Sequence, residues 1–194
     1  MFAIDSILAD AASIAALRRD IHAHPELCFE EKRTSDLIAR ALADWDIPVH
    51  RGMGTTGVVG IVKSGTSSRA VGLRADIDAL PMTEFNKFAH ASRHAGKMHA
   101  CGHDGHTAML LGAAKHFSKQ RDFDGTVYLI FQPAEEGGGG GREGQQARRA
   151  QRQQQKRQRG CAGEFGCQHQ SRSGANCSVH CRGWHWVHVR AESP

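Results

Sequence analysis

Residues 126–131 read TVYLIF, and the chain continues as QPAEE over 132–136 before a run of five glycines at 137–141. A short, continuous apolar run rich in β-branched and aromatic residues predicts a buried strand, here one covered on both faces. Glu135 and Glu136 follow directly on that strand. Because ligands of open α/β sheets bind beyond the carboxyl ends of the strands, this stretch predicts an α/β fold with acidic groups at a sheet edge.

The rest of the first two thirds alternates between helical and strand periodicity. Apolar residues recur at helical spacing in three segments, and two short β-branched runs lie between them. The expected helices cover about 4–24, 31–45 and 107–119, and the expected strands cover 57–62 and 70–74. Proline at position 25 should end the first helix, since the residue before a proline disfavours helix. We therefore expect an α/β fold, a partial mixed sheet with helices on both faces.

The composition divides the chain near residue 142. Residues 1–142 carry 16 basic and 17 acidic side chains, whereas residues 143–194 carry nine and three and contain no Leu, Ile or Met. Such a segment buries too little apolar surface to offset its chain entropy, so residues 143–194 are expected to form a disordered basic tail. Cys28 and Cys101 are the only cysteines before it, which argues against a disulfide framework.

Hydropathy and the amino-terminal sequence limit the location of the protein. The mean hydropathy is −0.47, and no apolar run of about 18 residues is present. The start carries Asp5 and Asp10 and lacks the basic leader and cleavage site of a signal peptide. We expect a cytoplasmic protein with no membrane partner.

Acidic residues follow two of the expected strands. Asp76 and Asp78 come after one strand, as Glu135 and Glu136 come after another. One interpretation is that such residues only mark solvated turns. A solvated turn gives no reason to place two adjacent acids before five glycines, and close like charges are best tolerated when a cation binds between them.

Residues 98–106, MHACGHDGH, carry the ligand types that a zinc-like ion prefers. The glycines predict a tight loop ahead of the helix expected from Thr107, which would let Cys101 and His103 point to one centre. The alternative to a metal site is a buried cysteine with surface histidines. Two carboxylate pairs on strand ends favour the metal site.

Four motifs in this order resemble a known family across residues 1–142. They are LRRDIHAHPEL (17–27), GLRADIDALPM (72–82), MHACGHDGHTAMLLGAA (98–114) and FQPAEEGGGGGR (131–142). Together they resemble the amidohydrolase branch of the aminoacylase and zinc-carboxypeptidase metallohydrolases, which includes hippurate hydrolases, N-acyl-amino-acid deacylases and auxin-conjugate hydrolases.

The resemblance implies hydrolysis of a small N-acyl amino acid at a centre of two divalent ions, which could be zinc, manganese or cobalt. Cys101 looks like the ligand shared by the two ions, and His103 and Glu136 look like further ligands. Glu135 looks like the general base, and Asp78 looks like the acid that orients the site. Three more residues are expected to support the ligands without binding metal: Asp76, which stands where relatives carry a histidine ligand, Asp104 and His106.

The resemblance also implies parts that this sequence lacks. Family members carry two more histidine ligands and an inserted lid domain, which often pairs subunits into homodimers, all beyond the position of the glycine run. Residues 1–142 are therefore interpreted as the N-terminal part of the catalytic domain, with an incomplete second metal site. Residues 143–194 are interpreted as foreign to the family, with the character of an out-of-frame translation. We expect little or no activity from the chain as written.

A second function class rests on the tail. Basic residues are dense over 148–159, and four cysteines and several histidines follow. Such a tail could attract phosphate backbones non-specifically or hold zinc, which would make the chain a non-catalytic binding module. The spacings C-x5-C and C-x3-C match no zinc finger or knuckle, so no specific nucleic-acid partner is expected.

Overall fold

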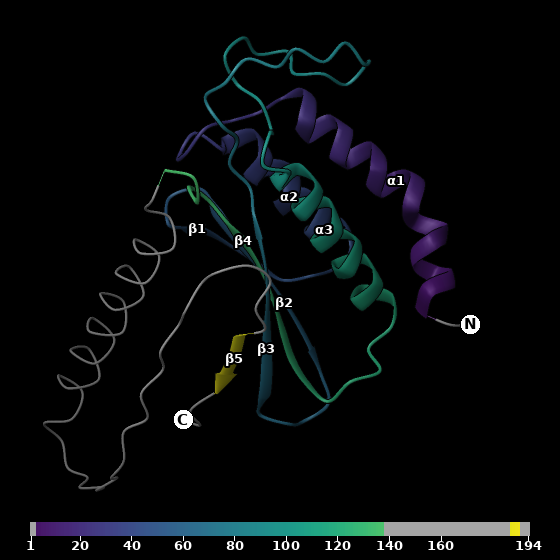
Figure 1. The fold of residues 1–194 in the computed structure, drawn as a ribbon. Coiled ribbons are helices and arrows are strands. Elements are labelled where there is room, and N and C mark those ends of the chain that lie inside the picture. Colours follow the sequence, from purple (N-terminus) through teal and green to yellow (C-terminus); the bar gives the residue numbers. More distant parts are fainter. Residues whose placement is uncertain (1–2, 138–186, 191–194) are drawn as a thin grey trace, which may run out of the picture.

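The computed structural model describes residues 3–137 and 187–190. It contains three helices and five strands within these ranges (Figure 1). In chain order they are α1 (Ala3–Ala23), α2 (Lys32–Asp44), β1 (Val49–Met53), β2 (Gly57–Ser64), β3 (Arg69–Asp76), α3 (His103–Lys119), β4 (Gly125–Gln132) and β5 (Val187–Arg190).

The strands form one mixed sheet in the order β1-β2-β4-β3-β5. Strands β3 and β4 are parallel neighbours, and every other pair is antiparallel. Helix α3 connects β3 to β4, so these three elements form a β-α-β unit. Since Asp76 pairs with Gln132 in the parallel register, the chain leaves both strands at the same edge of the sheet.

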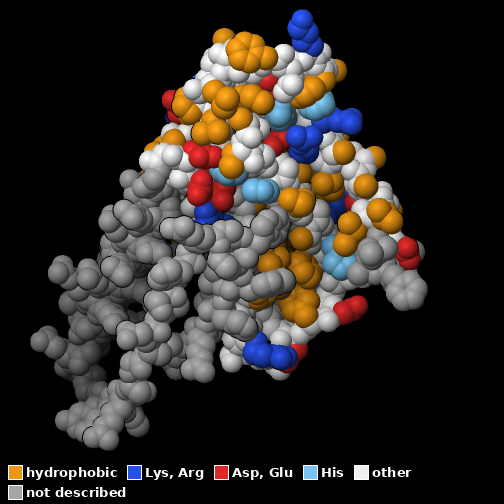
Figure 2. All heavy atoms as spheres, in the orientation of Figure 1, with side chains coloured by type: hydrophobic (Ala, Val, Ile, Leu, Met, Phe, Trp, Pro, Cys, Tyr) orange, Lys and Arg blue, Asp and Glu red, His pale blue; other side chains and the backbone are white. Residues whose placement is uncertain are grey.

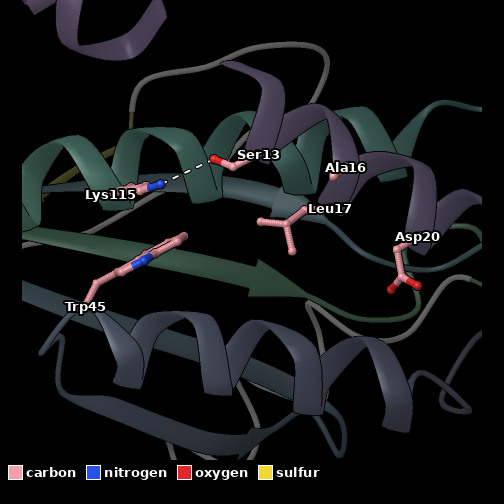
Figure 3. A pocket seen from close by; sticks show the side chains of 6 residues that line it. All are labelled: Ser13, Ala16, Leu17, Asp20, Trp45 and Lys115. Atoms are coloured by element: carbon pink, nitrogen blue, oxygen red, sulfur yellow. Dashed lines mark hydrogen bonds between the residues drawn. The ribbon is translucent and has the colours of Figure 1, made fainter. Parts of the chain in front are cut away.

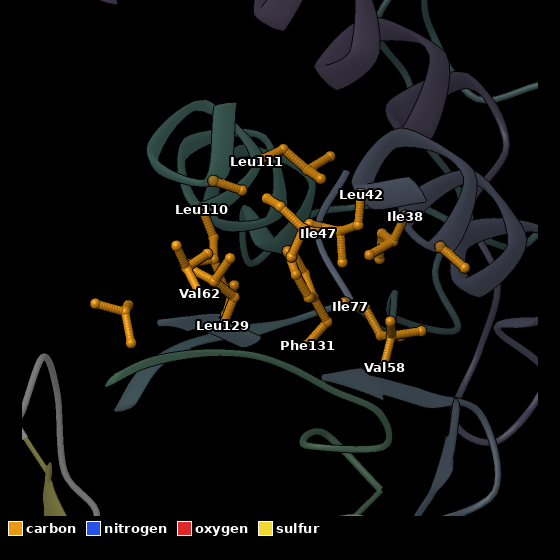
Figure 4. Packing of buried hydrophobic residues seen from close by; sticks show 14 residues of the cluster. Ile38, Leu42, Ile47, Val58, Val62, Ile77, Leu110, Leu111, Leu129 and Phe131 are labelled. Carbon is orange, nitrogen blue, oxygen red and sulfur yellow. The ribbon is translucent and has the colours of Figure 1, made fainter. Parts of the chain in front are cut away.

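The core lies between the sheet and the layer formed by α2 and α3 (Figure 4). Leu129 and Phe131 of β4 meet Leu42 of α2 and Leu111 of α3, and all four side chains are almost wholly inaccessible to solvent. Each such side chain contributes about 1.5–3 kcal/mol when removed from water. Helix α1 packs on α3, where Ile14 lies against Gly112. The sheet edge that carries the acidic residues is thus built on a packed scaffold.

The mixed α/β sheet predicted from the sequence is confirmed, but its helical cover differs from the expectation. In the described part of the chain, α2 and α3 pack against one face of the sheet, and α1 lies outside them (Figure 1). Burial alternates along β4 accordingly, because Val127, Leu129 and Phe131 are buried whereas Tyr128 and Ile130 are half-buried. Residues 126–131 are therefore not covered equally on both faces.

Helix α3 begins four residues earlier than the expected start at Thr107. Gly102 precedes the helix with a φ of +99°, in the left-handed region that glycine adopts at little cost. Its carbonyl oxygen accepts the N–H groups of Gly105 and His106 at 2.9 and 3.1 Å. Gly105 therefore lies inside the first helical turn, and His103 is the first helical residue instead of part of a loop.

Most of the tail predicted over 143–194 lies outside the described residues, as does the basic Cys/His-rich segment behind the binding-module alternative. The exception is Val187–Arg190, which forms β5 and pairs antiparallel with β3. The outer edge of β3 offers unpaired backbone groups to this extended segment, and the largely disordered state of the rest of the tail stays a prediction. No helix in the described part of the chain is long and apolar enough to cross a membrane.

Candidate metal centre

Segments that follow the two parallel strands lie side by side at the sheet edge. The N–H of Ile77 donates to the carbonyl oxygen of Gln132 at 3.0 Å, which extends the pairing past β3. One step further, the N–H of Glu136 donates to Oδ2 of Asp78 at 2.9 Å. Asp78 is only 1% exposed, so this carboxylate fixes the acidic turn after β4 from inside the molecule.

Three potential ligands from two segments meet at this edge. The ligand atoms of Cys101, His103 and Glu136 all lie within 4.8 Å of one another. Cys101 precedes the Gly102 cap of α3, and Glu136 comes from the turn after β4. A thiol, an imidazole and a carboxylate form a donor set that a zinc-type ion accepts, so these residues fit a divalent metal.

The imidazole of His103 is oriented by Asp78. Its Nδ1 donates to the carbonyl oxygen of Asp78 at 2.9 Å and lies 3.2 Å from Oδ1 of the same residue. Nε2 faces Glu136, with 3.9 Å between Nε2 and Oε1. A histidine that uses one ring nitrogen for such a contact offers the other to a metal in a fixed direction.

Charge is concentrated around these groups. Burial opposes the charged imidazolium of His103, but hydrogen bonds to Asp78 and the charge of Asp78 outweigh it and raise the pKa of His103 to about 9. Burial likewise opposes ionisation of Asp78, yet bonds from His103 and from the N–H of Glu136 hold its pKa below the ordinary value. Asp78 therefore holds the imidazole of His103 in one orientation through both a hydrogen bond and its charge.

The surroundings of Cys101 favour the neutral form of its thiol. Loss of solvation, and next the hydrogen bond and negative charge of Glu136, raise the pKa of its thiol to about 11, with smaller contributions from Glu135 and Asp76. On the face shown in Figure 2, acidic side chains gather beside histidine side chains near the sheet edge where β4 ends. Negative potential of this kind favours binding of a cation.

The remaining residues that sequence reasoning assigned to the site lie around this group. Glu135 is exposed next to Glu136. Asp76 forms an ion pair with Arg74, with 2.6 Å between Nη2 and Oδ1. The ring of His106 lies 5.6 Å from that of His103, measured between centroids. Glu135, Asp76 and His106 therefore lie near the three potential ligands but are not part of the group whose ligand atoms lie within 4.8 Å of one another.

Asp104 faces away from the ligands, toward α1. Its Oδ2 accepts the Nε–H of Arg18 at 2.8 Å and contacts Nδ1 of His22 at 2.8 Å. Nε2 of His22 in turn lies 3.2 Å from Oε1 of Glu84 in the long segment between β3 and α3. The motif LRRDIHAHPEL thus fastens α1 to the first turn of α3, a role that sequence reasoning did not assign.

Sequence reasoning also missed two buried polar groups near the site. Glu31, directly before α2, is completely buried and contacts the turn after β4. His99 is 4% exposed, and neither ring nitrogen has a hydrogen-bond partner among the described residues. His99 stands within the motif MHACGHDGH, which was a usable signal, whereas nothing in the sequence distinguishes Glu31 from a solvated acid before a helix.

A surface hollow elsewhere on the molecule does not coincide with this group. It lies between α1, α3 and the end of α2 (Figure 3), and it is mainly apolar. Its lining consists of Ser13, Ala16, Leu17, Asp20, Trp45 and Lys115. None of the three potential ligands lines it, so the hollow is separate from the candidate metal centre.

Comparison with known proteins shows which curated enzymes the chain resembles. The chain is 46% identical over 136 residues to the hippurate hydrolase of Campylobacter jejuni, covering 70% of this chain and 35% of that protein. It is 44% identical over 134 residues to the N-acyl-L-amino acid amidohydrolase of Geobacillus stearothermophilus, covering 69% and 35%. The chain thus spans about a third of the length of these curated relatives.

A solved structure shows the same similarity in three dimensions. A dinuclear metal binding peptidase of the M20 family from Bacillus subtilis superposes with a TM-score of 0.69 at 41% identity, covering 72% of this chain and 40% of that chain. The model of the peptidase family M20/M25/M40 matches residues 72–169, which is half of the chain. The resemblance seen in the four motifs is therefore confirmed, and the chain belongs to the peptidase family M20/M25/M40.

Proposed function

We propose that the chain is the N-terminal part of a metal-dependent amidohydrolase that cleaves N-acyl amino acids of the hippurate type. The observation that carries the proposal is the meeting of Cys101, His103 and Glu136 within 4.8 Å, directly beside Glu135. The names of the hippurate hydrolase and the N-acyl-L-amino acid amidohydrolase that the chain resembles support the substrate class.

The three ligand types would hold a zinc, manganese or cobalt ion. Such an ion supplies a Lewis acid that lowers the pKa of water and polarises the scissile carbonyl. Glu135 accepts the proton of the attacking water and delivers it to the leaving amine. Asp78 keeps His103 in the required orientation through the contacts to Nδ1. Within the described residues only one group of three ligands comes together, so a second ion needs further ligands.

The boundary near residue 142 belongs to the same proposal. The two curated matches cover 136 and 134 residues, whereas the family model extends to residue 169. We propose that family sequence ends near Arg142 and that a shift of reading frame produced residues 143–194. Translating the underlying nucleotides in the other frames tests this directly. A family-like continuation in another frame would support it, and its absence from both would refute it.

The roles of the two adjacent acids can be separated by substitution. Cobalt affinity is measured on the 194-residue chain with Glu135→Gln and with Glu136→Gln. Turnover of hippurate is measured on a chimera in which residues 1–142 replace the matching part of the Campylobacter jejuni enzyme. Glu135→Gln should retain the metal and lose turnover by about a hundredfold or more. If it loses the metal as completely as Glu136→Gln does, the assignment is wrong.

A further inference from the structure

Glu31 is a buried carboxylate that the proposed chemistry does not use. It directly precedes α2 and is 0% exposed. No ion pair of the described residues includes it, and its burial raises the pKa of its carboxyl despite hydrogen bonds that favour the charged form. A buried acid without a cation costs free energy, so its contacts need an explanation.

Both carboxylate oxygens of Glu31 bind groups on other elements. Oε1 accepts the N–H of Ala134 at 2.9 Å, and Oε2 accepts the hydroxyl of Thr56 at 2.6 Å. Thr56 lies in the turn between β1 and β2, and Ala134 lies in the turn after β4. One side chain at the start of α2 therefore joins two turns at the sheet edge.

The turn after β4 has a backbone conformation that requires support. Ala134 has a φ of +55°, in the left-handed region that is unfavourable for a residue with a Cβ atom. Such a conformation persists when the surroundings hold it. Glu31 holds its N–H, and two residues later Asp78 holds the N–H of Glu136 at 2.9 Å. Two buried carboxylates thus fix the turn that carries Glu135 and Glu136.

Close packing restricts the turn from the side of β2. A Cβ atom on Gly57 would lie 2.9 Å from Cδ of Pro133 and 2.2 Å from the carbonyl oxygen of Met53. Only a glycine permits this approach, and little room is left for Pro133 to shift. The acidic turn is therefore restricted from one side by the carboxylate of Glu31 and from the other by the approach of Gly57 to Pro133.

We propose that Glu31 is a positioning residue that aims Glu135 and Glu136 at the centre formed by Cys101 and His103. This inference rests on the proposed metal site. Glu31 acts through the N–H of Ala134 and touches neither metal ligand nor substrate. A glutamine can replace it, because the amide oxygen accepts from Ala134 and the amide N–H donates to Thr56. An alanine leaves the buried N–H of Ala134 without an acceptor.

Glu26, in the loop between α1 and α2, provides a matched control at the start of the same helix. Its Oε1 and Oε2 accept the N–H groups of Arg33 and Thr34 at 2.9 and 2.7 Å. Glu26→Ala therefore also removes two hydrogen bonds at the start of α2, but neither reaches the turn after β4. Loss that is merely structural should affect Glu26→Ala and Glu31→Ala alike.

The test measures amide exchange and cobalt binding on the full 194-residue chain for wild type, Glu31→Ala, Glu31→Gln and Glu26→Ala. After correction for the folded fraction from urea unfolding, Glu31→Ala should speed exchange at Ala134 and Glu136 and weaken cobalt binding, each about tenfold. Glu31→Gln and Glu26→Ala should stay within about threefold of wild type. A folded Glu31→Ala with wild-type exchange and affinity, or an equal effect of Glu26→Ala, would overturn the proposal.

Thr56→Val keeps the test decisive if Glu31→Ala does not fold. It removes the hydroxyl that holds Oε2, and exchange at Ala134 should then rise about fivefold. Unchanged exchange would refute the positioning role. If the wild-type chain binds no cobalt, the proposed function fails, while the exchange rates at Ala134 and Glu136 still decide whether Glu31 fixes the turn.

Discussion

Nδ1 of His103 lies 2.9 Å from the carbonyl oxygen of Asp78 and 3.2 Å from Oδ1 of the same residue. Oδ2 of Asp78 accepts the N–H of Glu136 at 2.9 Å. One buried aspartate therefore fixes two of the three potential ligands, one on the helix after the loop and one on the turn after β4. These two potential ligands are thus positioned by Asp78, a buried residue that is not itself one of the three.

Asp78→Asn should weaken divalent metal binding by about tenfold to a hundredfold, because the partner that orients His103 loses its charge. The substitution preserves shape, so the fold should be retained. The measurement is zinc affinity by competition with a chromophoric chelator. Asp76→Asn is the matched control, since its carboxylate pairs with Arg74. Equal losses for the two variants would contradict the role of Asp78.

Stability should depend on pH through Glu31. Because its pKa is raised in the folded protein, the folded state holds this proton more tightly than the unfolded state does. The free energy of unfolding therefore contains a contribution that falls as pH rises from the ordinary glutamate pKa through the raised one. Glu31→Gln removes that contribution.

Urea unfolding of wild type and Glu31→Gln across this pH window measures the effect. The free energy of unfolding of the variant minus that of wild type should increase with pH. A difference that stays constant, or one that decreases, would show that burial does not raise the pKa of the Glu31 carboxyl.

The contact between α1 and α3 should be a major source of stability. Asp104 is completely buried, and its Oδ2 lies 2.8 Å from both Nε of Arg18 and Nδ1 of His22. Asp104→Ala should cost about 3 kcal/mol of the free energy of unfolding, because it leaves a buried partner unpaired. Asp36→Ala, whose exposed carboxylate pairs with exposed Arg51, should cost less than about 1 kcal/mol. Similar losses in urea unfolding would contradict this account.

The 194-residue chain should show little turnover of hippurate or acetylated amino acids when supplied with zinc, manganese or cobalt. Zinc-type catalytic sites use three protein ligands in a set geometry, and a two-ion centre needs more than the three that meet here. The chimera containing residues 1–142 should be active. Turnover by the chain alone at the rate of the chimera would require a complete site within it.

Periodicity predicts the three helices and the strands β2, β3 and β4, because apolar side chains at fixed spacing determine which face is buried. The run at 126–131 became β4, and the segment 31–45 became α2. The edge strand β1, over Val49–Met53, was missed because its central residues are exposed and polar. Strand β1 forms because it pairs with β2 through backbone hydrogen bonds, which its amino-acid composition does not predict.

The site was predictable where its residues follow strands or a glycine-rich loop, as with Glu136 and Cys101. The glycines at 102 and 105 predict a loop and so place the start of α3 too late, whereas Gly102 only caps the helix and Gly105 lies inside its first turn. The role of Glu31 depends on a tertiary contact with Ala134, 103 residues away along the chain. No local pattern encodes such a contact, so the support of the site emerges only from the fold.

Cobalt titration of the purified 194-residue chain, followed by its thiolate absorption band, tests the central claim most directly. We expect one tightly bound ion per chain, and we expect Cys101→Ser to abolish the band and His103→Ala and Glu136→Gln to weaken binding by about a hundredfold or more. His116→Ala, at the other end of α3, should bind as wild type does. A band that survives Cys101→Ser, or equal binding by all four variants, would contradict a metal centre at this sheet edge.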